Sequence, residues 1–174
     1  MHVFLTGDRQ IGKSRALNGA LDLIGMPVYG FRTRFLTRER GSSSLYMTPA
    51  NNPEELSESA MVACLQDGKM RPLTERFDTL GAALLREARR HPEGVILMDE
   101  CGHLEKNAQV FQNEIQACLD GDIPVLGVLR RDQPWHDFIK RHPKVLVLTV
   151  DEQNRVDMAE RVAALIRQNE GGNP

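Results

Sequence analysis

The eight residues from Gly7 to Ser14 constrain this chain more than any other feature. They read G-D-R-Q-I-G-K-S, which has the spacing G-x4-G-K-[ST]. The apolar run His2–Thr6 before them predicts a strand, and the apolar periodicity after them predicts a helix. Strand, glycine-rich loop and helix in this order predict a phosphate-binding loop, because backbone N–H groups and the helix N-terminus both attract an anion.

Two side chains of this loop have expected roles in nucleotide binding. Lys13 is expected to reach the β- and γ-phosphates, where it would also assist catalysis, and the Ser14 hydroxyl is expected to ligate Mg²⁺. The loop residues and the arginine after them form the predicted nucleotide-binding segment: Gly7, Asp8, Arg9, Gln10, Ile11, Gly12, Lys13, Ser14 and Arg15.

Length and composition narrow the class of protein. The 174 residues predict a single domain over 1–170 with a frayed tail at 171–174, and the net charge of -2 argues against a general nucleic-acid binder. We find no stretch of membrane-spanning length and no signal peptide, so no membrane partner is expected. Cys64, Cys101 and Cys118 are scattered, as in a cytoplasmic protein with reduced thiols. The oligomeric state is open, with a monomer as the simplest expectation.

Apolar runs alternate with helical patterns along the rest of the chain, which predicts a three-layer α/β fold with a mainly parallel sheet. Strands are expected at Val28–Leu36, Val95–Met98, Pro124–Leu129 and Val145–Val150. An edge hairpin is expected near 28–48 around the polar stretch 38–43, followed by a short helix over Glu54–Leu65. Further helices are expected over Leu73–Ala88, Leu104–Cys118 and Trp135–Lys140, and a last helix should bury Val156, Ala159, Ala163 and Ile166.

The strand Val95–Met98 ends in Asp99 and Glu100, which predicts the second half of a nucleotide site. Asp99 is expected to anchor Mg²⁺. Glu100 is expected to orient and deprotonate the attacking water, the property that distinguishes hydrolases from most small-molecule kinases. The alternative is that Glu100 caps the next turn or pairs with an arginine.

Arg130 and Arg131 follow the strand Pro124–Leu129 at the same edge of the predicted sheet. A cation there could neutralise transition-state charge, and Arg130 is the predicted catalytic one. The alternatives are a solvated pair of arginines at a strand end, or Arg9 of the loop in that role.

A GTPase switch protein is a further alternative. The residues Asp99–Gly102 fit D-x-x-G, and Asn154–Asp157 loosely resemble the guanine-reading N-K-x-D. Arg155 stands in place of the lysine, and Asn154 is better interpreted as the N-cap of the last helix.

With both motifs placed, the chain resembles the cancer-related nucleoside-triphosphatase family of P-loop proteins. The resemblance is strongest at Asp99–Glu105, which fits the family's D-E-x-G-x-x-E, and extends to Gly25–Thr33 and to Asn154-Arg155 after the last strand. It implies a RecA-like sheet and slow Mg²⁺-dependent hydrolysis of several nucleoside triphosphates, and it adds Asn154 and Arg155 to the predicted nucleotide-binding residues. Glu100 after the third strand suggests the RecA-like strand order 5-1-4-3-2.

Two departures from the family pattern concern the site. His103 stands where the family usually has lysine; if it acts near the γ-phosphate, its protonation should raise activity between about pH 8 and 6. The segment between Thr33 and Leu73 lacks family motifs, which leaves its contacts open.

Two function classes therefore remain. The first is a P-loop nucleoside triphosphatase. The second is a phosphotransferase, or a binding module that uses nucleotide as a switch. A phosphotransferase would need an acceptor pocket and an arginine-bearing lid, for which the stretch Arg32–Arg40 is a candidate; otherwise this stretch is a solvated hairpin.

Overall fold

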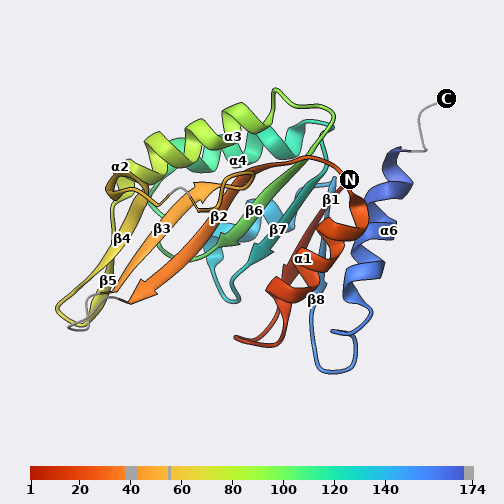
Figure 1. The fold of residues 1–174 in the computed structure, drawn as a ribbon, viewed down its shortest axis with the longest axis horizontal. Helices are drawn as coiled ribbons and strands as arrows, with labels where there is room; N and C mark the ends of the chain where they lie inside the picture. The colour runs from red at the N-terminus through yellow and green to blue at the C-terminus, as the bar shows by residue number, and fades with distance from the viewer. Residues whose placement is uncertain (38–42, 55, 171–174) are drawn as a thin grey trace.

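A single eight-stranded sheet runs through the computed structural model, which describes residues 1–37, 43–54 and 56–170. Its spatial order is β5-β4-β3-β2-β6-β7-β1-β8 (Figure 1). The strands are β1 (His2–Thr6), β2 (Val28–Thr37), β3 (Ser43–Pro49), β4 (Met61–Gln66), β5 (Lys69–Pro72), β6 (Val95–Cys101), β7 (Val125–Leu129) and β8 (Val145–Thr149).

Five of these strands are parallel and keep the predicted order. Counted along the chain, β1, β2, β6, β7 and β8 lie in the order 5-1-4-3-2, with β7 between β1 and β6. The sheet differs from the prediction at its other edge. There β3, β4 and β5 add three antiparallel strands, where the sequence indicated one hairpin partner.

Helices cover both faces of the sheet (Figure 1). On one face lie α1 (Lys13–Ile24) and α6 (Met158–Glu170). On the other lie α3 (Ala82–Ala88), continuous with α2 (Thr74–Arg76) and η3 (Phe77–Gly81), and α4 (Gln109–Asp120). The short elements η2 (Glu58–Ala60), η4 (Pro134–His136) and α5 (Asp137–Lys140) complete the chain.

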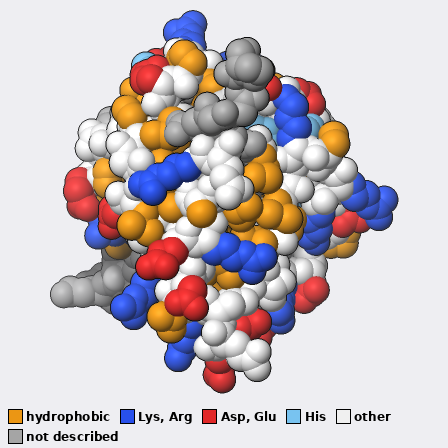
Figure 2. All heavy atoms as spheres, turned by 90° about the vertical axis from the view of Figure 1, so that its right-hand side faces the viewer, with side chains coloured by type: hydrophobic (Ala, Val, Ile, Leu, Met, Phe, Trp, Pro, Cys, Tyr) orange, Lys and Arg blue, Asp and Glu red, His pale blue; other side chains and the backbone are white. Residues whose placement is uncertain are grey.

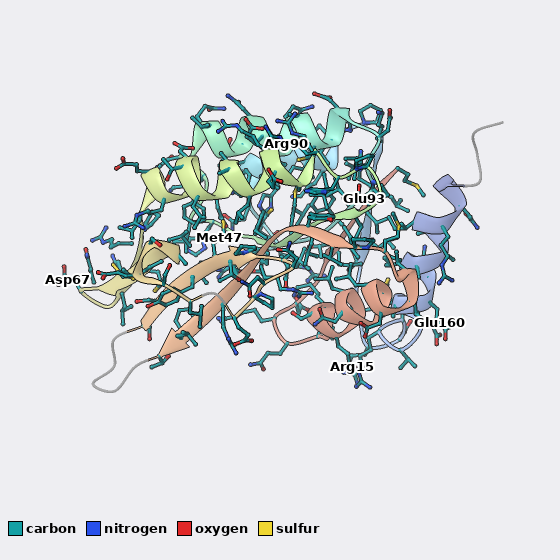
Figure 3. The ribbon with its side chains drawn as sticks, turned by 45° about the horizontal axis from the view of Figure 1, so that its top comes forward. Arg15, Met47, Asp67, Arg90, Glu93 and Glu160 are labelled. Carbon is teal, nitrogen blue, oxygen red and sulfur yellow. The ribbon has the colours of Figure 1, made fainter. Side chains whose placement is uncertain are left out.

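Two apolar layers follow from this arrangement. Phe31, Phe77 and Phe111 pack between the sheet and the helices α3 and α4. The ring centroid of Phe111 lies 5.5 Å from that of Phe31 and 5.9 Å from that of Phe77. Met47 lies in the same layer, beneath α3 (Figure 3). The second layer holds fully buried residues such as Leu5 and Leu17. Since both faces of the parallel strands are covered, their continuous apolar runs are explained.

The seam between β2 and β6 joins the parallel sheet to the antiparallel strands. Gly30 sits in it at φ +96°, and a Cβ there would approach the Leu97 carbonyl oxygen to 2.2 Å. Only glycine fits this position without displacing the backbone.

We call the strands β3, β4 and β5, together with residues 33–37 of β2, the antiparallel extension. The helix predicted over Glu54–Leu65 is wrong, because Met61–Gln66 is β4 and pairs with both β3 and β5. Asp67 and Gly68 close the β4–β5 hairpin with φ of 49° and 71°, as a tight two-residue turn requires. Asp67 marks the hairpin tip, at the end of the molecule far from α6 (Figure 3).

The last helix begins later than its pattern indicated. Because α6 starts at Met158, Val156 lies before it and is 79% exposed, while Met158 is buried in its place. The predicted frayed tail 171–174 and most of the polar stretch 38–43 lie outside the described residues. Within the described ranges, no helix combines the length and apolarity needed to cross a bilayer.

The edge formed by β8 carries partly exposed apolar side chains. Val145, Leu146 and Val147 are half-buried along this outermost strand. Figure 2, which views the molecule from this side, shows hydrophobic side chains gathered near the centre with charged side chains around them.

Candidate active site

The loop from Gly7 to Gly12 adopts a backbone that requires glycine at its first position. Gly7 has φ +146°, and a Cβ there would come within 2.5 Å of the Val150 carbonyl oxygen. Gly12, at φ 113°, precedes the first residue of α1. The N-terminus of this twelve-residue helix therefore opens directly from the loop, as anion binding requires.

The Lys13 ammonium lies across the loop that it follows. It donates hydrogen bonds to the carbonyl oxygens of Gly7 at 3.0 Å and Asp8 at 2.7 Å. A polar cavity of about 710 Å³ opens beside it, and we call this the loop cavity.

The loop cavity collects most of the predicted site. The predicted residues that line it are Gly7, Asp8, Arg9, Gln10, Gly12, Lys13, Ser14, Arg15, Glu100 and Arg130. Arg131, Asp132 and Gln133 complete the lining, of which Asp132 and Gln133 were missed by the sequence reading. Their signal was their position directly after the two arginines at the end of β7.

The arginines after β7 are held by neighbouring loops. Arg131 donates to the Asp8 carboxylate at 2.6 Å, which ties the phosphate loop to the end of β7. The Arg130 backbone N–H donates to the Cys101 carbonyl oxygen at 2.9 Å, and its guanidinium donates to His103 Nδ1 at 3.0 Å. Arg130 thus stands at the mouth of the loop cavity, next to the end of β6.

Glu100 is half-buried at the end of β6. Its backbone N–H donates to the Thr33 hydroxyl of β2 at 3.2 Å. Within the described part of the chain its carboxylate makes no ion pair, so the alternative of a structural pair with arginine has no support. The carboxylate lines the loop cavity and is available for chemistry there.

Asp99 faces away from the loop cavity. It lies 3.5 Å from the Arg32 guanidinium, which also donates to the Asn18 side chain at 2.9 Å, and these three residues line a separate cavity. The pKa of Asp99 is raised to about 6, mainly by burial; the nearby Arg32 cation opposes this rise, and Glu100 adds to it. The structure therefore places the two predicted metal ligands, Ser14 and Asp99, on different cavities.

The donor chemistry nevertheless fits magnesium. An exposed Ser14 hydroxyl and a carboxylate supply the oxygen ligands that Mg²⁺ prefers, with phosphate oxygens completing the set. Among the described residues, no cluster of three or more His, Cys, Asp or Glu forms a metal site by itself. A magnesium ion would accordingly be held jointly by the protein and the nucleotide.

The surroundings of His103 favour an uncharged ring. Burial lowers the pKa of its imidazole, and the Arg130 and Lys106 cations lower it further. The Arg130 guanidinium can only donate, so this contact requires an unprotonated Nδ1, which argues against the expected activation by protonation between pH 8 and 6.

Glu105 holds the turn after β6. Its carboxylate is 2% exposed and accepts the Gly102 N–H at 3.3 and 3.1 Å. Burial raises its pKa to about 7. The last glutamate of the D-E-x-G-x-x-E pattern is therefore buried, and its hydrogen bonds with Gly102 hold the segment that follows Glu100 in place.

A groove behind the loop is lined by some of the remaining predicted residues. Ile11, Arg15 and Arg155 line it together with the exposed Val156, and Arg15 projects outward from the start of α1 (Figure 3). We call it the Arg155 groove. Asn154 lies outside it.

Asn154 has a structural role in the turn after β8. Its side chain donates to the Thr149 carbonyl oxygen at 2.9 Å and accepts the Asp151 N–H at 3.1 Å. It does not cap α6, which starts four residues later at Met158, so that interpretation is wrong. The reason is the turn over residues 152–157, which uses the side chain locally.

A second cavity of about 590 Å³ adjoins the loop cavity, and we call it the side cavity. Arg9, Glu100 and Arg130 line both cavities. The extension supplies its apolar side through Phe35, Leu45 and Met70. The candidate lid arginines Arg32 and Arg34 lie elsewhere, paired with Asp99 and Glu54, while positions 38 and 40 lie outside the described residues.

Comparisons with known proteins agree with this geometry. A model of a family described as NTPase matches residues 2–163. The chain is similar to nucleoside-triphosphatase THEP1 of Methanosarcina barkeri, with 28% identity over 97% of this chain and 98% of that protein. It is also similar to nucleoside-triphosphatase THEP1 of Methanocaldococcus jannaschii, with 26% identity over 90% and 92%.

Two solved structures share the fold. The crystal structure of THEP1 from the hyperthermophile Aquifex aeolicus superposes with a TM-score of 0.75 at 19% identity, covering 95% of this chain and 99% of that one. The solution structure of a human cancer-related nucleoside triphosphatase gives 0.65 at 20% identity, covering 99% of each.

Proposed function

The chain belongs to the NTPase family, and on that premise we propose that it hydrolyses nucleoside triphosphates to diphosphate and phosphate with Mg²⁺ as cofactor, slowly and with broad base tolerance. The observation that carries the proposal is the loop cavity. It joins the phosphate loop to a carboxylate, Glu100, that makes no ion pair among the described residues, and to a cation, Arg130. A site that binds phosphates and also holds a base is suited to water attack on phosphorus.

The triphosphate runs along the loop in this proposal. Backbone N–H groups of residues 7–14 and the start of α1 hold the α- and β-phosphates, and Lys13 moves from its loop carbonyls to the β- and γ-phosphates. The γ-phosphate then points toward Glu100. The opposite direction leads to the Arg155 groove, where Arg15 and Arg155 flank the base. An open groove without buried polar groups suits broad base tolerance.

Ser14 would hold the metal together with the phosphate oxygens, and Asp99, which pairs with Arg32 on a separate cavity, would have to release Arg32 to join it. Bound Mg²⁺ supplies neutralisation of phosphate charge. The chain's own residues do the rest: the Glu100 carboxylate takes the proton of the attacking water, and the Arg130 guanidinium stabilises charge on the γ-phosphate oxygens. The water oxygen forms the new bond to phosphorus, and the diphosphate leaves with the electrons of the broken bond.

We extend the proposal to a single domain over residues 1–170 in the cytoplasm. All three cysteines are free, and Cys101 and Cys118 are buried with a raised thiol pKa. Such thiols suit a reducing compartment.

Phosphate release without any acceptor tests this function. ATP, GTP, CTP and UTP are supplied in turn with Mg²⁺, and each reaction is repeated with a chelator in place of the metal. We expect release from all four nucleotides and loss of release without metal. Absence of release from every nucleotide would reject hydrolysis, and undiminished release with chelator would reject the magnesium role.

A further inference from the structure

Apolar side chains line much of the side cavity, although an attacking water molecule needs none of them. Phe35 is 56% exposed at this wall, and Leu45, directly opposite it on β3, and Met70 of β5 continue the apolar surface. Leu104 faces them from the turn after β6. An exposed aromatic ring inside a concave apolar surface is typical of a ligand site.

The charges around this cavity are mainly positive at its rim. Arg9, at the loop, and Lys69, at the start of β5, line the cavity, and within the described residues neither makes an ion pair. The carboxylates lie deeper: Glu105 is 2% exposed and bonded to Gly102, and Glu100 lies at the boundary with the loop cavity. An anionic group is therefore favoured at the rim, away from Glu100.

The side cavity and the loop cavity meet at residues that line both of them. Glu100 and Arg130 line both, and in the proposed function the γ-phosphate lies beside them. A molecule in the side cavity consequently has its deep end next to the phosphorus that reacts, with Glu100 as the nearest base.

We propose that the side cavity binds a small hydroxylated organic acid with an apolar body, and that its hydroxyl takes the γ-phosphoryl group in place of water. The apolar body packs on Phe35, the acid group faces Lys69, and the hydroxyl faces Glu100. The hydroxyl oxygen forms a bond to the γ-phosphorus while the bond from that phosphorus to the bridging oxygen breaks. The hydroxyl proton passes to Glu100, and the diphosphate leaves with the electron pair.

This inference rests on the proposed function for the place of the γ-phosphate, so binding and transfer are tested separately. The binding probe is para-(hydroxymethyl)benzoate, which has a ring, a carboxylate and a primary hydroxyl. Its matched relatives are para-toluate, which lacks the hydroxyl, and benzenedimethanol, which lacks the carboxylate. Saturation-transfer NMR without nucleotide measures binding, and fragments of this size are expected to bind with dissociation constants on the order of 1 mM.

Two variants and one control identify the site. Phe35→Ala should weaken both ring acids and benzenedimethanol roughly fivefold, because the ring loses its stacking surface. Lys69→Gln should weaken the two acids up to about fivefold and leave benzenedimethanol unchanged. Arg71→Gln, which removes an exposed cation from the same strand but outside the cavity lining, should change neither. Equal binding by parent, Phe35→Ala and Lys69→Gln, or no binding at roughly 10 mM, would overturn the site.

Transfer is tested with ATP labelled at the γ-phosphate and either para- or meta-(hydroxymethyl)benzoate. We expect a labelled phosphomonoester with at least one isomer and none with para-toluate. If an acid binds but the labelled ATP yields only free phosphate and no ester, the acceptor role would be overturned and hydrolysis would stand. Neither ester nor free phosphate would contradict the proposed function and the acceptor role together, while the binding result would still decide whether the cavity holds an acid.

Discussion

The two walls of the candidate site differ in how the chain builds them. One wall is a continuous segment, residues 7–15, that joins β1 to α1 and presents glycine backbone, Lys13 and Ser14. The opposite wall gathers Phe35, Leu45 and Met70 from three strands of the extension. The first depends on local backbone geometry, and the second depends on strand pairing between distant residues.

This difference separates the roles of the two walls. The loop wall has a chemistry common to phosphate binding, which requires fixed N–H groups and a cation. The extension wall has side chains that can be replaced without changing the backbone, and so it is suited to choosing a second ligand. Substitutions on the two walls should accordingly produce different kinds of loss, and the variants below test this.

Glu100→Gln, at the junction of the two walls, should have the largest effect. The amide keeps the shape of the carboxylate but cannot take a proton, so hydrolysis should slow at least tenfold, within the roughly 10²–10⁴-fold range of general bases. Binding of Mg²⁺-ATP should stay near that of the parent by calorimetry. Glu54→Gln, an exposed carboxylate outside the loop cavity, is the control, and near-parental phosphate release by Glu100→Gln would place water activation elsewhere.

Lys13→Ala should weaken triphosphate binding roughly 50-fold, the loss expected when a charged hydrogen-bond donor to phosphate is removed. Calorimetric titration with ATP and with GTP measures the change. Lys140→Ala, on the exposed side of α5, is the matched control. Parental affinity in Lys13→Ala would remove the loop wall from the nucleotide site.

Glu105→Gln should change the pH dependence of stability. The folded-state pKa of Glu105 is raised to about 7 from 4.5, so the folded protein binds more protons than the unfolded chain between these values. Its contribution to stability is therefore present below about pH 4.5 and is lost as pH rises through about 7.

The uncharged variant should consequently gain stability over the parent by on the order of 1–3 kcal/mol at pH 8, and the gain should vanish near pH 4.5. Urea unfolding at a series of pH values measures both. A difference that is independent of pH would mean that folding does not raise the pKa of Glu105.

His103→Gln should have the smallest effect. Burial and the neighbouring cations lower the pKa of His103 from its usual value of 6.5, so the neutral imidazole predominates from pH 7 to 8. The ratio of parent to variant phosphate release should stay constant over that range and below about threefold. A ratio that grows toward pH 6.5 would show that a protonated imidazole does act at the site.

The sequence predicted the loop wall because its information is local. G-x4-G-K-[ST] fixes the backbone, and the parallel strand order followed from the alternation of strands and helices together with Glu100 after the third strand. The hairpin of β2 and β3 was predicted, whereas β4 and β5 were missed because Met61–Gln66 is stabilised by pairing with β3 and β5. The Asp67-Gly68 turn was the available signal.

The predicted site residues also fall into two groups, those that the structure brings to the loop cavity and those that it does not. Residues 7–10, 12–15, Glu100 and Arg130 share one cavity, because they lie in the loop or directly at strand ends of a parallel sheet. Asp99 and Asn154 are next to such ends, but Asp99 engages Arg32 through tertiary packing and Asn154 engages Thr149 within its own turn. Their assignment to metal and nucleotide therefore stays a prediction.

The length of β2 has a mechanical consequence. Its residues Val28–Arg32 pair with β6 as far as Asp99, while residues 33–37 continue beyond that pairing and, among the described residues, pair only with β3. Five residues of strand span about 17 Å. Since Met47 of β3 and Val62 of β4 are buried in the same apolar layer as Phe77, the part of the extension that can bend is this end of β2. Its bending stiffness, with Thr33 at the support, sets how far Phe35 can swing relative to the turn after β6, and hence the size of molecule that fits between them.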